Sequence, residues 1–209
     1  MICRAPYEFG QPILITAACS AGDDGIINIE HEADLSSESY DKAVMIIEGF
    51  LRSHYEDKYH MSFRSSVCFE QSYSIIDGDS ASAAEIFAIL SAVTGVKLRQ
   101  DLAVTGSVNQ HGDIQPIGGV NEKIEGFYKL CRHHGLTGKQ GVIVPRANID
   151  NLLLPQEIID AVAKKQFHIY PISTIDEGIS LFTGMESDEF NALAKKKFKE
   201  LVSKIKGNK

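Results

Sequence analysis

A serine-rich turn with two acids stands directly before a run of residues with helical character. The stretch "IIDGDSASAAE", Ile75 to Glu85, contains Asp77, Gly78, Asp79 and Ser80. A serine at a tight turn before a helix exposes its hydroxyl, and the free amides of the first helical turn can stabilise an oxyanion. Gly78 would let the backbone approach a substrate closely. Ser80 is therefore a candidate nucleophile for attack on a carbonyl carbon.

A helix cap is a second interpretation of the same stretch. Ser82 and Glu85 have the spacing S-x-x-E of a capping box, in which the two side chains satisfy free amides at the start of a helix. This interpretation explains Ser82 and Glu85 but leaves Ser80 and the two acids without a purpose. Both interpretations stay open on these residues alone.

A serine nucleophile needs a base, because its hydroxyl is a poor nucleophile at its free pKa. In "IGGVNEKIEGF", Lys123 lies near the start of a predicted helix, and Ile117, Val120 and Ile124 indicate burial on one side. Burial and the helix N-terminus would both lower the pKa of Lys123, so that its neutral amine could accept a proton. A solvated helical lysine is the alternative.

Histidine and metal patterns are weaker. The stretch "GDSAS" lacks the second glycine of G-x-S-x-G, and Ala81-Ser82 stands where chymotrypsin-like proteases have two glycines. "HEADL" at His31 lacks the second histidine of a metalloprotease helix. His111, in the turn "NQHGD", is the base that a Ser/His hydrolase would use. The four cysteines form no CxxC pair, which predicts neither a zinc site nor a disulfide framework.

Helical and strand-like segments alternate along the chain and must position these residues. Apolar spacing and caps predict helices over 35–56, 83–95, 120–135, 155–165, 174–184 and 190–206. Strands are predicted over 12–18, 25–30, 61–70, 101–108, 114–119, 141–145 and 167–172. We expect hairpins between 12–18 and 25–30 and between 101–108 and 114–119. This order predicts an α/β (α+β) fold: a mixed sheet with packed helices and a C-terminal amphipathic helix.

Composition sets the class of protein. The chain has 209 residues, 44% of them hydrophobic and 23% charged, which is typical of one soluble globular domain. The net charge of −7 gives no basic surface for nucleic acid, since the basic residues gather only near the end. No apolar run is long enough to span a membrane. Unpaired, reduced cysteines favour a cytoplasmic location.

Two motifs together resemble the proteolytic domain of the Lon family of ATP-dependent proteases. The family's serine motif, D-G-P-S-A-G, falls on residues 77–82, and its lysine motif, G-G-x-x-E-K, falls on residues 118–123. The resemblance implies a Ser/Lys dyad in which Ser80 is the nucleophile and Lys123 the general base. It also implies that Thr105, at a strand end, holds the lysine in place.

The resemblance also implies a division of the chain, with departures from the family pattern. It runs over residues 7–184, the expected proteolytic domain, between an N-terminal junction (1–6) and a basic amphipathic C-terminal helix (185–209). Asp79 and Ser82 replace the common proline and glycine, as in the B-type, archaeal-like branch. In that branch Asp77 and Asp79 would support the dyad, or would stabilise protonated Lys123 and keep the domain inactive. Ser107 stands where glutamate is common, which leaves its role open.

The implied chemistry is metal-free hydrolysis of a peptide bond. Neutral Lys123 would take the Ser80 proton, and amides around Gly78 to Ala81 would bind the oxyanion. No cofactor is expected in this domain. ATP and Mg²⁺ would belong to an AAA+ ATPase module absent from this sequence, which has no G-x-x-x-x-G-K-[ST].

The resemblance extends to the expected whole protein. The sequence is expected to be the C-terminal part of a longer, hexameric enzyme that degrades unfolded or damaged proteins. The alternative is a self-inhibited oligomerisation module with an idle dyad.

Overall fold

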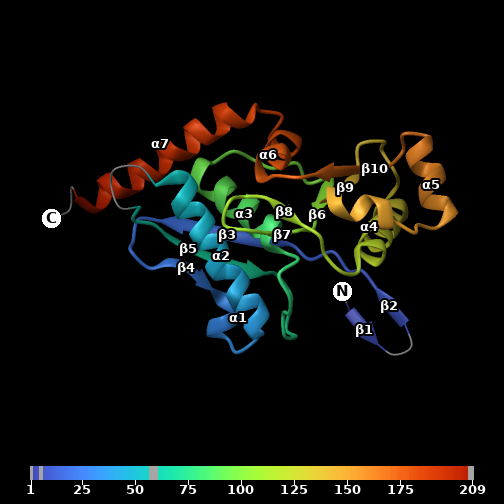
Figure 1. Cartoon of the computed structure of the whole chain (residues 1–209), viewed down its shortest axis with the longest axis horizontal. Helices are drawn as coiled ribbons and strands as arrows, with labels where there is room; N and C mark the ends of the chain where they lie inside the picture. The colour runs from blue at the N-terminus through green and yellow to red at the C-terminus, as the bar shows by residue number, and fades with distance from the viewer. Residues whose placement is uncertain (1, 5–6, 57–60, 207–209) are drawn as a thin grey trace.

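The computed structural model describes residues 2–4, 7–56 and 61–206. Its helices are α1 (Ile29–Glu32), α2 (Glu38–Tyr55), α3 (Ser82–Thr94), α4 (Val120–His134), α5 (Gln156–Ala163), α6 (Ile175–Thr183) and α7 (Ser187–Lys206), with a 3₁₀ helix η1 (Arg146–Asn151). Its strands are β1 (Ile2–Arg4), β2 (Tyr7–Phe9), β3 (Ile15–Ser20), β4 (Gly25–Asn28), β5 (Arg64–Phe69), β6 (Leu102–Val104), β7 (Ser107–Val108), β8 (Ile114–Gln115), β9 (Gly141–Pro145) and β10 (His168–Ile172). The predicted mixture of strands and packed helices is confirmed (Figure 1).

The first sheet has the order β3-β5-β4, with β5 antiparallel to β3 and parallel to β4. The predicted hairpin between residues 12–18 and 25–30 is therefore wrong. After β4 the chain passes through α1 and α2, and its return places β5 between the two strands, where both edges of β5 find hydrogen-bonding partners. The predicted strand over 61–70 is confirmed, and Ser65, Val67 and Phe69 on alternate positions of β5 are buried.

The second sheet has the order β10-β9-β6 and is parallel throughout. Its central strand, β9, is buried along its whole length. Parallel strands are covered by helices on both faces, so they consist mainly of apolar residues, as "GVIVP" does. The prediction of a short buried strand here is confirmed.

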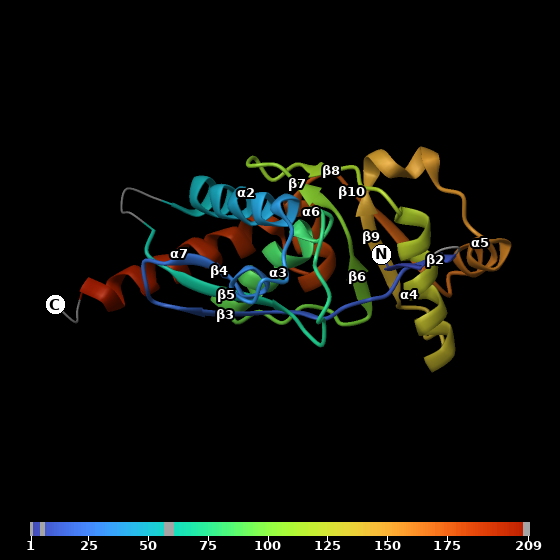
Figure 2. The ribbon, with the colours of Figure 1, turned by 90° about the horizontal axis from the view of Figure 1, so that it is seen from below.

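This parallel sheet separates two hydrophobic cores. Neighbouring side chains of β9 face opposite ways: Ile143 belongs to the larger core, and Val142 and Val144 belong to the smaller one. Helices α2, α3, α6 and α7 contribute buried side chains to the larger core, and α4 and α5 contribute them to the smaller core. Both views show α3 and α4 on opposite sides of β6 and β9 (Figures 1 and 2).

The predicted hairpin between residues 101–108 and 114–119 is confirmed, although its strands are short. β7 and β8 pair antiparallel, with Ser107 opposite Gln115. The turn includes Gly112, whose φ of 87° is a conformation that favours glycine. β6 precedes this hairpin but belongs to the parallel sheet. The predicted strand over 101–108 is therefore two strands, β6 and β7, which lie in different sheets.

Helix α7 packs on the domain's own larger core. Phe190, Ala194 and Phe198, spaced four residues apart, are buried there. The lysines of the tail occupy other positions, and Lys195 and Lys196 are exposed. The predicted amphipathic C-terminal helix is confirmed. Among the described residues, no helix combines the length and apolar character needed to cross a membrane.

Candidate active site

Ser80 lies two residues before α3, in a turn shaped by Gly78. The φ of Gly78 is 79°, in the left-handed region that other residues rarely adopt. A Cβ added to Gly78 would meet nothing within 4 Å. The glycine is therefore explained by this backbone conformation and not by close packing against the rest of the protein.

Lys123 reaches the serine from the other core. It is the fourth residue of α4, whose neighbours Val120 and Ile124 are buried as predicted. Its Nζ lies 2.6 Å from Ser80 Oγ, within hydrogen-bonding distance. Burial lowers the pKa of Lys123 below its usual value, and the charge of Asp79 opposes this shift.

Thr105 connects the two residues from the end of β6. Its hydroxyl donates to the carbonyl oxygen of Ser80 at 3.0 Å and accepts from Lys123 Nζ at 3.2 Å. The amide of Gly106 donates to the same Ser80 carbonyl at 2.8 Å. Thr105 and Gly106 thus hold the turn of Ser80 through its carbonyl group, and Thr105 also orients the Lys123 side chain.

The two acids beside Ser80 have different partners. Asp79 Oδ2 accepts a hydrogen bond of 2.7 Å from the buried hydroxyl of Ser107 on β7. Asp77 Oδ1 accepts from the hydroxyls of Ser37 and Ser39, at 2.6 and 2.7 Å. Those two bonds, with a third from the Gly78 amide, lower the pKa of Asp77.

Asp77 is therefore engaged by serines at the start of α2. The sequence indicates Ser37 and Ser39 only as helix caps, and Ser37 does cap α2 by accepting from the Tyr40 amide. Their link to Asp77 spans about forty residues of chain, and no local spacing could have indicated it.

The amide of Gly78 is also engaged. It donates to Asp77 Oδ1 at 2.9 Å and to Ser39 Oγ at 3.0 Å, so it does not point free toward a substrate. From the sequence, we expect the amides of residues 78–81 to bind an oxyanion. Because the Gly78 amide is already engaged, the candidates are the amides of Asp79, Ser80 and Ala81.

The predicted capping box of Ser82 and Glu85 is wrong. Ser82 is the first residue of α3, and its hydroxyl donates to the Asp79 carbonyl at 2.7 Å instead of accepting from the helix. The Glu85 side chain points into the protein, where its Oε1 accepts a hydrogen bond of 2.6 Å from the hydroxyl of Tyr40. The apolar packing between α2 and α3 offers Glu85 a buried partner that the pattern of the helix alone does not reveal.

Glu85 is a buried acid in an unusual setting. It is 1% exposed, and its Oε2 has no hydrogen-bond partner among the described residues. Burial raises the pKa of Glu85 to about 7, the bond from Tyr40 opposes the rise, and Glu30 adds to it. The side chain therefore holds a proton at pH values where an exposed glutamate is ionised.

His111 lies in the exposed β7–β8 turn, where its amide donates to Asn109 Oδ1 at 2.8 Å. Among the described residues, no hydrogen bond joins the His111 ring to Ser80. Within the described ranges, no three His, Cys, Asp or Glu side chains gather as metal ligands. The arrangement at Ser80 thus pairs it with an amine and not with an imidazole.

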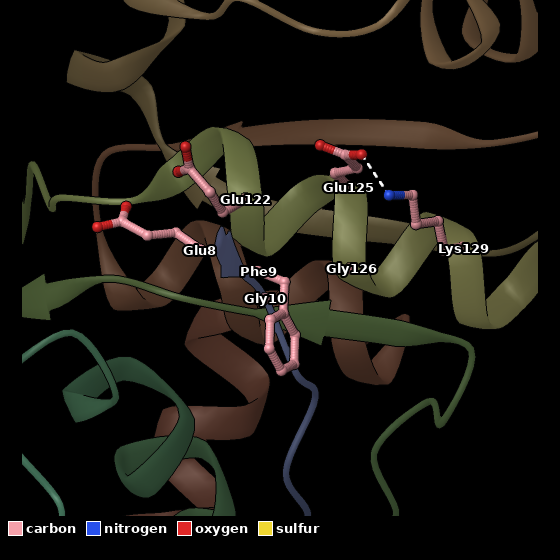
Figure 3. Close-up of a pocket in the computed structure, with 7 residues that line it drawn as sticks. All are labelled: Glu8, Phe9, Gly10, Glu122, Glu125, Gly126 and Lys129. Atoms are coloured by element: carbon pink, nitrogen blue, oxygen red, sulfur yellow. Dashed lines mark ion pairs between the residues drawn. The ribbon is translucent and has the colours of Figure 1, made fainter. Parts of the chain in front are cut away.

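A pocket beside α4 contains neither Ser80 nor Lys123. Its lining residues are Glu8, Phe9, Gly10, Glu122, Glu125, Gly126 and Lys129 (Figure 3). Here the chain after β2 crosses α4 so closely that a Cβ on Gly126 would lie 2.1 Å from the Gly10 carbonyl oxygen. The pocket therefore lies where the chain after β2 packs against α4, the helix that carries Lys123.

Comparison with known proteins gives a consistent result. The model of the family described as "Lon protease (S16) C-terminal proteolytic domain" matches residues 8–183. The chain is 42% identical over 183 residues to a protein of Escherichia coli (strain K12) named "Putative Lon protease homolog", covering 88% of this chain and 31% of that protein. A protein of the same name from Haemophilus influenzae is 39% identical over 181 residues, covering 87% and 30%.

Archaeal sequences also match. An "Archaeal Lon protease" of Methanocaldococcus jannaschii is 40% identical over 119 residues, which cover 57% of this chain and 16% of that protein. The chain therefore spans less than a third of the length of these relatives.

Proposed function

The chain belongs to the family of Lon C-terminal proteolytic domains, and on that premise we propose that it is a serine endopeptidase with a Ser80/Lys123 dyad. The observation that carries the proposal is the 2.6 Å contact between Ser80 Oγ and Lys123 Nζ. A lysine serves as a base only when its amine is neutral, and burial moves the pKa of Lys123 in that direction.

In the acylation step, Lys123 Nζ accepts the Ser80 proton while Ser80 Oγ bonds to the carbonyl carbon of the substrate. The carbonyl oxygen becomes an oxyanion, which the amides of Asp79 to Ala81, in the turn just before α3, stabilise. When the C–N bond breaks, the protonated lysine gives its proton to the leaving amine, and an acyl-enzyme remains.

Deacylation repeats these steps with water. Lys123 takes a proton from the water, whose oxygen attacks the ester carbon, and Ser80 Oγ recovers the proton as it leaves. Thr105 supports both steps, because it contacts Lys123 Nζ and the Ser80 carbonyl together. The chemistry described requires no metal.

The wider setting is proposed from the family. We propose that this domain works with an AAA+ ATPase module, which would use ATP and Mg²⁺, in a hexameric ring that degrades unfolded or damaged proteins. A cytoplasmic location fits the free thiols of Cys19, Cys68 and Cys131.

The test is cleavage of a fluorogenic peptide and of an unfolded protein by three variants. Ser80→Ala and Lys123→Ala should each lower kcat by at least about 10³-fold, since the members of a dyad act as a unit. Their melting temperatures should stay close to that of the parent protein. His111→Ala should retain full activity. Undiminished cleavage by either dyad variant contradicts the proposal, and loss of activity in His111→Ala alone would favour a Ser/His hydrolase.

The alternative is an idle assembly module, motivated by the two acids beside Ser80. Ser37 and Ser39 engage Asp77, whereas the charge of Asp79 favours protonated Lys123. Size-exclusion chromatography combined with the same peptidase assay separates the two functions. A stable ring without turnover under any condition would support the assembly module.

A further inference from the structure

Side chains at the start of α2 form hydrogen bonds with the turn that carries Ser80. Ser37 and Ser39 Oγ lie 2.6 and 2.7 Å from Asp77 Oδ1, and the two hydroxyls are 2.9 Å apart. Ser39 Oγ also accepts from the Gly78 amide at 3.0 Å. The Asp77 carboxylate and the Gly78 amide therefore form one hydrogen-bonded cluster with the two serine hydroxyls at the start of α2.

Backbone bonds extend this contact on one side. The Ser37 amide donates to the Ile76 carbonyl at 3.0 Å, and the Ile76 amide donates to the Leu35 carbonyl at 2.8 Å. Ser36 and Ile76 consequently form a parallel β-bridge. The segment that leads to Ser80 is therefore also held through its backbone at Ile76, directly before Asp77.

The cluster acts where the turn most needs support. Gly78, at a φ of 79°, has great conformational freedom because it lacks a Cβ. Its neighbour Asp77 is exposed, so burial does not fix its rotamer. The two serine hydroxyls replace packing as the restraint on the backbone two residues before the nucleophile.

We propose that Ser37 and Ser39 are positioning residues of the peptidase, which hold the turn 77–80 through Asp77 so that Ser80 Oγ faces Lys123. The inference rests on the proposed function. Neither serine contacts the reacting atoms; they act through Asp77 and Gly78.

The two serines differ in what their loss would change. Ser37 also caps α2, and removal of an N-cap typically costs about 1 kcal/mol of stability. Ser39 is exposed and has no capping role. Ser39→Ala is therefore the cleaner variant. Ser36→Ala is its matched control, because Ser36 lies on the same segment but its hydroxyl bonds to His31 Nδ1 at 3.4 Å, away from Asp77.

The experiment measures kcat and KM for a fluorogenic peptide, and the rate at which a fluorophosphonate modifies Ser80. Misplacement of a reacting group by a fraction of an ångström lowers rates strongly, so Ser39→Ala should lose about tenfold in kcat and in the modification rate, with KM changed less than about twofold. Ser39→Thr, which keeps the hydroxyl, should recover most of the loss. Ser36→Ala should match the parent protein.

A double-mutant cycle tests the route through Asp77. In an Asp77→Asn background, Ser39→Ala should have an effect several-fold smaller than in the parent protein, because the shared contact is already weakened. Parental rates in Ser39→Ala overturn the inference, as does a loss that Ser39→Thr does not restore or that adds fully to that of Asp77→Asn. Activity that survives in Ser80→Ala would overturn the proposed function instead, so the two failures are distinguishable.

Discussion

At the scale of the residue, opposing influences act on the proton of Lys123. Burial favours the neutral amine, whereas the Asp79 carboxylate favours the cation. The bond from Ser107 holds Asp79 in its place beside the dyad. In the proposed mechanism, Asp79 therefore tunes the pH at which the Lys123 amine becomes neutral and takes no part in the bond-making steps.

The pH profile tests this role of Asp79. If the neutral amine is the base, kcat/KM rises with pH through the pKa of Lys123, which is lowered from its usual value. Asp79→Asn keeps an acceptor for Ser107 but removes the charge that raises this pKa. The rising limb of the profile should therefore move to lower pH. A limb that stays in place or moves to higher pH would contradict the assignment, and Asp113→Asn, in the β7–β8 turn, serves as a control for loss of an exposed acid.

At the scale of the element, α2 and α3 share contacts that local sequence does not reveal. Tyr40, from the first turn of α2, donates to Glu85 in the first turns of α3. The serines of the same turn of α2 bind Asp77. The N-terminal end of α2 therefore restrains both the turn that carries Ser80 and α3, the helix that follows this turn.

The pH dependence of stability tests the buried Glu85. Its pKa is raised to about 7 in the folded protein, so the folded state binds a proton that the unfolded state releases near pH 4.5. This contribution is fully present below pH 4.5 and is lost as pH rises through about 7. The free energy of unfolding should fall by about 2–3 kcal/mol more in the parent protein than in Glu85→Gln between pH 5 and pH 8.

Denaturant titrations at several pH values would measure this difference. Glu85→Gln keeps an acceptor for Tyr40 OH and cannot ionise, so its own stability should be much flatter over this range. If the free energy of unfolding had the same pH dependence in both proteins, Glu85 would not titrate between pH 5 and pH 8. Glu38→Gln, on an exposed position of α2, controls for the loss of a surface acid.

The sequence predicts well those elements whose signals are local. Gly95 ends α3 with a φ of 75°, and Ser37 begins α2 as an N-cap. The proximity of Ser80 and Lys123 is predicted by the resemblance of their two motifs to those of the Lon family, because the residues alone leave a helix cap and a solvated lysine as alternatives. The placement of β5 between β3 and β4, and the inward turn of Glu85 toward Tyr40, depend on contacts between distant segments. Such contacts are decided by tertiary packing, which competes with local patterns and prevails over them.

At the scale of the whole molecule, α7 completes the larger core. Phe198 is 2% exposed and packs edge-on against Phe63 and beside Tyr55. Tyr55 OH also donates to Asn191 of α7 at 2.7 Å. The helix after residue 184 therefore contributes to the stability of the domain on which it lies.

Truncation of one side chain of α7 tests this contribution. Phe198→Ala leaves a cavity in the core and should lower the free energy of unfolding by about 3–5 kcal/mol. Lys196→Ala, on the exposed face of the same helix, should change it by less than about 0.5 kcal/mol. Chemical denaturation measures both, and similar values for the two variants would mean that α7 is not part of the cooperative unit.

The parallel sheet that separates the two cores has a further consequence. Ser80 lies in the turn before α3, a helix of the larger core, and Lys123 lies on α4, a helix of the smaller core. The 2.6 Å contact between Ser80 Oγ and Lys123 Nζ joins the two. A hydrogen bond tolerates only a few tenths of an ångström before it weakens. In the proposed mechanism, catalysis therefore depends on how the two cores are aligned: a small shift of one core against the other would separate Ser80 from Lys123 and stop the reaction while every helix and strand stayed folded.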